Sequence, residues 1–93
     1  MTTPLTDTSV PRFPRGVRLR LDKIREAWIV LAPERVFVPD EHALAVLNLV
    51  DGARTVAAII TTLAETFATP AAIVGPDVHD MLADLANRGA LTW

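Results

Sequence analysis

Residues 17–38 have the sequence VRLRLDKIREAWIVLAPERVFV, and this stretch decides the fold. Its first five residues alternate strictly between apolar and basic side chains, which is the two-residue period of a half-buried β-strand. The β-branched and apolar run at residues 27–32 is typical of a strand that is central in its sheet or covered on both faces. Residues 35–38 predict a third short strand, because Pro33 presets a turn before it and Pro39 ends it. The stretch therefore predicts a three-stranded antiparallel β-meander.

The second half of the chain changes to the 3.6-residue period of amphipathic helices. A first helix is predicted between the N-cap Asp40 and a stop at Gly52. A second helix follows the N-cap Thr55 and ends near Pro70, and a third, with acidic residues in its first turn, follows a Gly-Pro connector at residues 75–76. The apolar stripes of these helices are Ala43, Leu44, Leu47 and Val50, then Val56, Ile59, Ile60, Leu63 and Phe67, then Val78, Met81, Leu82 and Leu85.

A β-meander followed by three α-helices is an α+β layout, in which the helices pack on one face of the small sheet. The second and third helices can form a helix-turn-helix with the strands as a wing, so the predicted architecture is winged-helix-like. Residues 1–14 are rich in Thr and Pro without apolar periodicity and are predicted to be a flexible N-terminal arm. Residues 15–93 are predicted to form a single domain, as expected for a chain of this length.

The composition argues against catalysis by this chain. Cysteine is absent, which excludes disulfides, thiolate metal sites and cysteine nucleophiles. The two histidines, His42 and His79, are not spaced as a helical metal pair, and the four glycines are isolated, so no metal and no nucleotide or other cofactor is expected. Asp80 and Asp84 share a helix face, but acid–base chemistry needs a dry cleft that an exposed helix does not provide. The sequence therefore predicts a protein that is not an enzyme.

The sequence also bears on location and assembly. No apolar run approaches the ~20 residues of a membrane span, and residues 1–10 do not resemble a signal peptide. We therefore expect a cytoplasmic protein without a membrane partner. A monomer in dilute solution is expected, with a dimer by strand exchange as the alternative, because the meander leaves a sheet edge unpaired.

Charge is divided unevenly along the chain. Residues 1–25 carry six basic and two acidic side chains (net +4), and residues 26–93 carry three basic and nine acidic ones (net −6). A winged helix-turn-helix domain that binds nucleic acid is the alternative function, but its recognition helix must enter a groove lined by phosphates. The third predicted helix carries three aspartates against Arg88, so no nucleic-acid partner is expected.

A binding module is the function that remains. The edge of a three-stranded meander has unpaired N–H and C=O groups, which can accept an extended segment of a partner as a fourth strand. The strand at residues 35–38 has no internal proline or lysine that would block this, and the third helix can supply an apolar wall beside it. Arg18 and Arg20 point to the polar face of the first strand, toward solvent or an acidic partner. We predict that reversing both charges weakens partner association without unfolding the domain.

Three motifs occur in an order and spacing that resemble a known family. They are the turn LAPER at residues 31–35, the helix junction DGART at residues 51–55, and the pair DV at residues 77–78. Over about residues 14–92 the chain resembles the PqqD family of pyrroloquinoline quinone (PQQ) biosynthesis. The resemblance implies a recognition element for ribosomally made, modified peptides (RiPPs), which acts as a peptide chaperone. It would bind the precursor peptide PqqA and present it to the radical S-adenosylmethionine enzyme PqqE, which joins a glutamate and a tyrosine side chain of that peptide.

The resemblance also implies where the peptide binds. In related recognition elements the leader peptide adds as a strand beside the third strand and lies against the third helix. Carried onto this chain, the implied peptide-binding residues are Arg35, Val36, Phe37 and Val38 on the strand and Asp77, Val78, Met81, Leu82 and Leu85 on the helix. For Phe37, Met81 and Leu82, burial in the core is the competing interpretation, because apolar stripes at helical spacing usually form the core.

Overall fold

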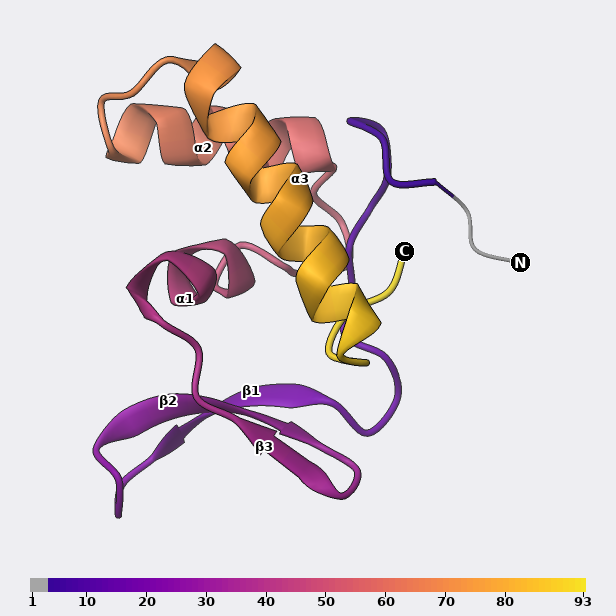
Figure 1. Ribbon diagram of the computed structural model, residues 1–93, viewed down its shortest axis with the longest axis vertical. Coiled ribbons are helices and arrows are strands. Elements are labelled where there is room, and N and C mark those ends of the chain that lie inside the picture. Colours follow the sequence, from indigo (N-terminus) through magenta and orange to yellow (C-terminus); the bar gives the residue numbers. More distant parts are fainter. Residues whose placement is uncertain (1–3) are drawn as a thin grey trace.

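The computed structural model describes residues 4–93 and contains three strands followed by three helices. These elements are β1 (Arg18–Asp22), β2 (Ala27–Ala32), β3 (Arg35–Phe37), α1 (Glu41–Leu47), α2 (Val56–Thr66) and α3 (Ala71–Asn87). Figure 1 shows the sheet at one end of the molecule, with α1 between the sheet and α2, and α3 running diagonally across the helical part. The predicted α+β fold is confirmed. Across residues 4–93, the helices are too short or too polar to span a lipid bilayer.

The sheet has the strand order β1-β2-β3, so β2 is central and the other two strands are its edges. Leu19 of β1 pairs with Val30 of β2, and Val30 pairs with Phe37 of β3. Directly opposed residues lie on the same face of a sheet. This face packs on the helices, since Val30 is fully buried in the core cluster and the other two side chains pack against that cluster.

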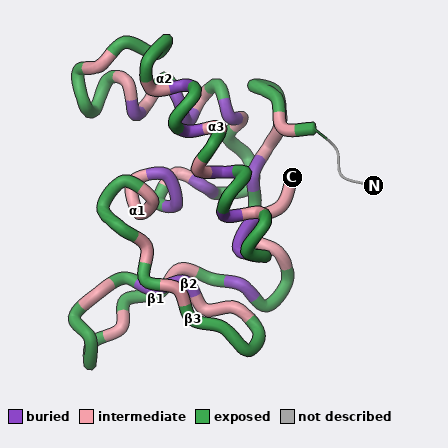
Figure 2. Tube along the Cα trace, in the orientation of Figure 1, coloured by how far each residue is buried: buried purple, intermediate pink, exposed green. Residues whose placement is uncertain are grey.

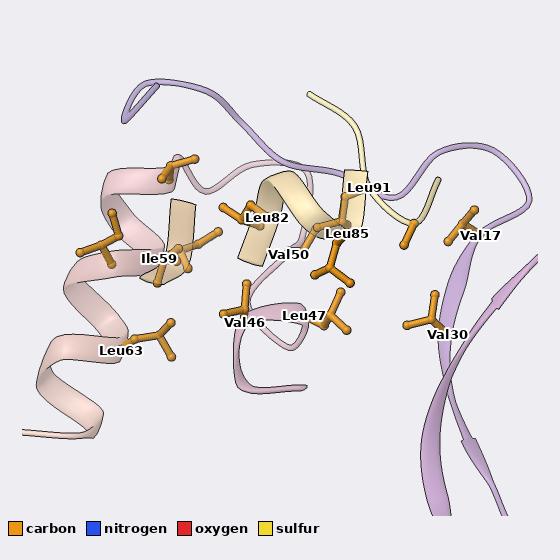
Figure 3. Packing of buried hydrophobic residues seen from close by; sticks show 14 residues of the cluster. Val17, Val30, Val46, Leu47, Val50, Ile59, Leu63, Leu82, Leu85 and Leu91 are labelled. Carbon is orange, nitrogen blue, oxygen red and sulfur yellow. The ribbon is translucent and has the colours of Figure 1, made fainter. Parts of the chain in front are cut away.

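One hydrophobic cluster joins the sheet to all three helices (Figure 3). Its fully buried members include Val30 of β2, Leu47 of α1, Ile59 of α2 and Leu82 of α3. Complete burial of such an aliphatic side chain stabilises a fold by about 1.5–3 kcal/mol. The buried positions lie where the helices face one another and the sheet (Figure 2). The cluster therefore fixes the position of α3 relative to the sheet, which is the geometry that any site between them requires.

Helix α3 is longer than the sequence predicts. The helix begins at Ala71 and includes Gly75 and Pro76, so the prediction that these two residues form a connector is wrong. Pro76 removes one backbone N–H donor from the helix. Packing offsets this loss, because Gly75 is buried and a Cβ atom added there would lie 3.7 Å from Ile60 Cδ1 of α2. The first turn of α3 contains no acidic residue, so the predicted acidic start is also wrong.

Helix α1 is shorter than the sequence predicts. It ends at Leu47, whereas the sequence places the stop at Gly52. After Leu47 the chain continues in a tighter turn, in which the N–H groups of Leu49 and Val50 donate to the carbonyl oxygens of Val46 and Leu47 (3.0 and 3.2 Å). This turn keeps Val50 buried in the core, which explains why its apolar position resembles a further turn of α-helix.

The N-terminal segment lies against the rest of the domain over its described residues. The side chain of Pro11 is fully buried, and Leu5 and Phe13 pack against the core cluster. Arg12 and Thr92 exchange two backbone hydrogen bonds of 2.8 and 2.9 Å, which joins this segment to the C-terminus as an isolated β-bridge. The composition of residues 1–14 did not predict these contacts with the core and with the C-terminus. The flexibility of residues 1–14 stays a prediction, and residues 1–3 of that arm lie outside the described residues.

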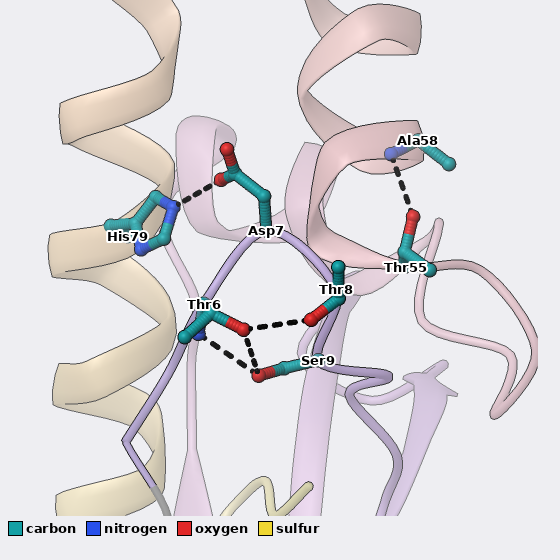
Figure 4. Close-up of polar contacts among 7 residues, drawn as sticks. All are labelled: Thr6, Asp7, Thr8, Ser9, Thr55, Ala58 and His79. Atoms are coloured by element: carbon teal, nitrogen blue, oxygen red, sulfur yellow. Dashed lines mark hydrogen bonds and ion pairs between the residues drawn. The ribbon is translucent and has the colours of Figure 1, made fainter.

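The same segment satisfies the start of α2. The N–H of Val56 donates to the carbonyl oxygen of Ser9, and the N–H of Ala57 donates to that of Asp7, each at 2.9 Å. The first N–H groups of a helix have no partner within the helix, so the segment caps α2 from outside. The Asp7 carboxylate also lies 2.8 Å from His79 Nε2 of α3 (Figure 4). The segment thus joins the N-terminus of α2 to the middle of α3.

Candidate functional site

The third strand leaves one edge of the sheet open. Among residues 4–93, β3 pairs with β2 alone, and no backbone hydrogen bond fills its other side. The strand follows the turn Ala32-Pro33-Glu34-Arg35, in which Glu34 has a positive φ of 63°. A positive φ at the third position is the geometry of a type II turn, with proline at the second position. The turn reverses the chain so that β3 returns along β2 and forms the exposed edge.

A groove with a volume of about 890 Å³ opens beside this edge. Its walls come from the end of β3 with the chain that follows, from α1, from the C-terminal end of α2 and from α3. Three large apolar side chains that line it are unusually exposed: Val38 at 62%, Phe67 at 50% and Ile73 at 60%. Exposed apolar side chains gathered around a concave surface mark a binding site for an apolar partner.

The rim of the groove is acidic. Asp77, Asp80 and Asp84 of α3 line it, and Arg88 Nε lies 3.2 Å from Asp84 Oδ2. Asp77 and Asp80 are exposed and form no ion pair with any of the described residues. The carboxylate of Asp40 at the opposite wall accepts from the N–H of Ala43 (2.8 Å) and thereby caps α1. An apolar ligand with a basic side chain beside Asp77 and Asp80 would match this surface.

The structure divides the predicted peptide-binding residues into two groups. Those that line the groove are Phe37, Val38, Asp77, Val78, Met81 and Leu85. Arg35, Val36 and Leu82 do not line it. Leu82 is fully buried in the core, so for this residue the competing interpretation holds. Phe37 and Met81 both pack on the core and line the groove, which makes them part of its floor.

Two groove residues escape the sequence prediction. Ile73 lies in the first turn of α3, a region that the sequence assigns to a connector, and it is 60% exposed and lines the groove. Phe67 belongs to the predicted apolar stripe of the second helix, but it is the C-cap of α2 and half-exposed. A helical start at residue 71 would have put Ile73 one turn before Asp77, and this spacing is the signal that could have found it.

The other predicted partner residues lie on the opposite face of the sheet. Arg18 pairs with Leu31, which pairs with Val36, and Arg20 pairs with Ile29. These positions alternate with the set that packs on the helices, so they share the outer face. The structure therefore separates Arg18, Arg20 and Val36 from the groove.

Outside the groove, one carboxylate organises the junction before α2. Asp51 accepts hydrogen bonds from the backbone N–H groups of Arg54 (2.8 Å) and Ala53 (2.9 Å). These two bonds, that of Arg54 first, lower the pKa of Asp51 from its ordinary value of 3.8. Asp51 and Arg54 also belong to the junction motif noted in the sequence. In the part of the chain that the structure describes, no three His, Asp or Glu side chains gather as a metal site would require.

The fold and the groove define a small winged-helix-like recognition domain, with a free strand edge beside an apolar groove. The family model described as "Coenzyme PQQ synthesis protein D (PqqD)" matches residues 27–91. The chain belongs to the PqqD family.

Curated relatives and solved structures agree. A "PqqA binding protein" of Rhodopseudomonas palustris (strain TIE-1) is 51% identical over 88 residues, which are 95% of this chain and 86% of the relative. The "Bifunctional coenzyme PQQ synthesis protein C/D" of Methylorubrum extorquens is 47% identical over 89 residues, which are 96% of this chain and 24% of that protein.

The solution NMR structure of the PqqD truncation of Methylobacterium extorquens PqqCD, described as a functional stand-alone RiPP recognition element, has a TM-score of 0.80 at 46% identity and covers 98% of this chain and 97% of its own. The crystal structure of PqqD from Xanthomonas campestris has a TM-score of 0.55 at 36% identity, covering 91% of this chain and 94% of its own. The predicted family, fold and non-catalytic class are therefore confirmed.

Proposed function

We propose that this chain is a peptide chaperone of PQQ biosynthesis that binds a PqqA precursor peptide by strand addition to β3 and presents it to the enzyme PqqE. The observation that carries the proposal is the open edge of β3, which continues directly into the apolar groove. The printed name of the relatives, PqqA binding protein, supports the choice of peptide. We propose that the chain binds and presents the peptide in the cytoplasm, and that it does so as a monomer.

Backbone hydrogen bonds to the free edge supply the first part of the affinity. A peptide strand laid along Arg35–Phe37 pairs its own N–H and C=O groups with those that β2 leaves unused. Each such bond contributes about 0.5–1.5 kcal/mol net. Because β3 has only three residues, these bonds alone give weak binding, and the groove must supply the rest.

The groove supplies both selectivity and further affinity. Side chains along the added strand alternate between the two faces of the sheet. Those on the inner face enter the groove and contact Val38, Phe67 and Ile73, whose exposed surfaces are then buried. A basic side chain of the peptide can reach Asp77 or Asp80 at the rim. The preferred ligand is thus an extended segment with apolar residues at every second position and a nearby Lys or Arg.

The acidic rim also argues against the alternative function. A nucleic-acid duplex presents a row of phosphates, and binding to it depends on their neutralisation by Lys and Arg. The exposed groove surface of α3 carries Asp77 and Asp80 without basic partners among residues 4–93. A peptide, by contrast, can supply the missing positive charge.

The double variant V38S/I73S tests the proposal. Both side chains are exposed by about 60% (62% and 60%), so the fold does not depend on them. Loss of two apolar contacts in a groove lowers affinity by at least about tenfold. We expect that loss in calorimetric titrations with synthetic PqqA, together with an unchanged thermal midpoint.

The matched control is Ile24→Ser, which removes the same kind of side chain at 96% exposure outside the groove. It should bind PqqA as the wild type does. Equal affinities for the wild type, V38S/I73S and the control would overturn the groove as the peptide site.

A further inference from the structure

The outer face of the sheet, which the groove does not use, has a hollow of its own with a volume of about 580 Å³. We call this surface the outer patch and define it by Arg18, Arg20, Lys23, Ile24, Leu31 and Val36. All but Arg18 line the hollow, and Arg18 is the cross-strand partner of Leu31. The patch is thus a contiguous surface made by all three strands and the β1–β2 turn.

The centre of the outer patch is apolar and exposed. Ile24 is 96% exposed and Val36 is 49% exposed, whereas Ile29 at the base of the hollow is only 4% exposed. The turn that carries Ile24 is held by the Asp22 carboxylate, which accepts from the N–H of Ile24 (3.0 Å) and the N–H of Arg25 (3.3 Å). The side chain of Ile24 therefore contributes no packing to this fold, and its exposure is available for contact with another molecule.

The edge of the outer patch is basic. Arg18, Arg20 and Lys23 form no ion pair with any of the described residues, while the neighbouring Arg25 is 3.6 Å from Asp22. The groove on the other side of the sheet has the opposite sign, with Asp77 and Asp80 at its rim. Complementary charge selects partners and raises the rate of encounter. The two surfaces therefore select partners of opposite charge.

We propose that the outer patch docks the acidic, apolar-centred surface of a folded protein, and that this protein is the enzyme that receives the peptide. This inference rests on the proposed function. It names a docking face that is separate from the groove, so that enzyme and peptide can be bound together.

Strand β3 connects the two surfaces. Phe37 lines the groove and Val36 belongs to the outer patch, because neighbouring residues of a strand point to opposite faces. A peptide strand added to β3 carries every second side chain onto the outer face beside Val36. The bound peptide then extends the outer patch, and an enzyme docked there contacts chaperone and peptide side by side.

The test is calorimetric titration of purified PqqE into the wild-type chain, alone and saturated with synthetic PqqA, and into the variant R18E/R20E. We expect this variant to lose about tenfold or more in affinity for PqqE, as reversal of charges at a complementary interface does. Its affinity for PqqA stays within about twofold of the wild type, since neither arginine lines the groove.

Two further variants keep the test specific. R12E/R15E makes the same change in net charge at exposed positions that neither line the outer patch nor form an ion pair with any of the described residues, and it should bind PqqE as the wild type does. Ile24→Ser removes the apolar centre at a side chain that is 96% exposed, and it should lose about fivefold or more in PqqE affinity.

Wild-type affinity of R18E/R20E for PqqE overturns the proposal, and so does a wild-type chain that binds PqqA but not PqqE. Loss of self-association in sedimentation, or of a shift with random DNA duplex, as the sole effect of R18E/R20E overturns it too and assigns the outer patch to a second copy or to nucleic acid. If the wild type does not bind PqqA but R18E/R20E still loses affinity for PqqE, the groove is refuted as the peptide site and the outer patch is supported as the docking face for the enzyme.

Discussion

The two faces of the small sheet differ in chemistry although they share the same three strands. The inner face meets the helices and opens at β3 into an apolar groove with an acidic rim. The outer face combines the exposed Ile24 and Val36 with Arg18, Arg20 and Lys23, which form no ion pair with any of residues 4–93. The alternation of a β-strand is enough to produce this difference. A domain of this size can therefore present two surfaces of opposite charge without a second core.

The largest expected effect concerns the hydrophobic core that joins α3 to the sheet. Leu82 is fully buried and contacts the core from α3, so Leu82→Ala leaves a cavity. Such a change lowers the free energy of unfolding by about 2–5 kcal/mol. Urea denaturation measures this directly. Leu21→Ala, at a side chain that is 45% exposed, is the matched control and should cost about 0.5 kcal/mol or less. Equal costs for the two variants would contradict the burial of Leu82 in the core.

The sequence predicts the order of the elements and the core because local signals agree there with the final packing. The alternation from Val17 to Leu21, the proline turn and the capping residues Asp40 and Thr55 all act within a few residues, and both caps are present, accepting from the N–H groups of Ala43 and Ala58. The start of α3 is mispredicted because tertiary contact between Gly75 and α2 overrides a local helix-breaking signal.

The site is predicted less completely than the fold. The implied peptide-binding set assigns four consecutive residues of the third strand to one surface, yet Val36 and Phe37 must point to opposite faces. The contacts of the N-terminal segment could not be predicted either, because its carbonyl oxygens meet α2 across more than forty residues of sequence. A pattern within a few residues cannot predict a hydrogen-bond partner so far away in the sequence.

A smaller effect separates the charges of the two faces. D77N/D80N removes from the groove rim two carboxylates that form no ion pair within residues 4–93, and it leaves the shape of the side chains unchanged. We expect about a threefold loss of PqqA affinity at low salt, and a difference that shrinks as the salt concentration rises, because exposed charges are screened. Affinity for PqqE should not change. An equal loss at high and low salt would mean that the rim does not act through its charge.

The junction before α2 gives a prediction about pH. The backbone N–H groups of Arg54 and Ala53 lower the pKa of Asp51 below 3.8. A carboxylate with a lowered pKa stabilises the folded state above its unfolded value, and this contribution is lost as the pH falls through the lowered value. We expect the NMR titration midpoint of Asp51 to lie below that of Asp51 in the urea-unfolded chain. A midpoint at or above the unfolded value would contradict the hydrogen bonds that we describe.

The smallest effect is expected on the side of α3 that faces neither partner surface. The Asp7 carboxylate lies 2.8 Å from His79 Nε2, and its side chain is 68% exposed. Exposed pairs of this kind contribute less than about 1 kcal/mol. Asp7→Asn should therefore leave both PqqA and PqqE binding unchanged and lower the thermal midpoint only slightly. A loss of peptide affinity in this variant would show that the N-terminal segment takes part in binding.

The most direct test of the central claim is an NMR titration of the isotopically labelled chain with synthetic PqqA. We predict that the amide signals of residues 35–38 and of the groove wall on α3 shift, that the free-edge amides of β3 become protected from hydrogen exchange, and that cross-strand contacts join the peptide to β3. Shifts confined to residues 1–25, with the β3 edge still exchanging freely, would contradict strand addition at this edge.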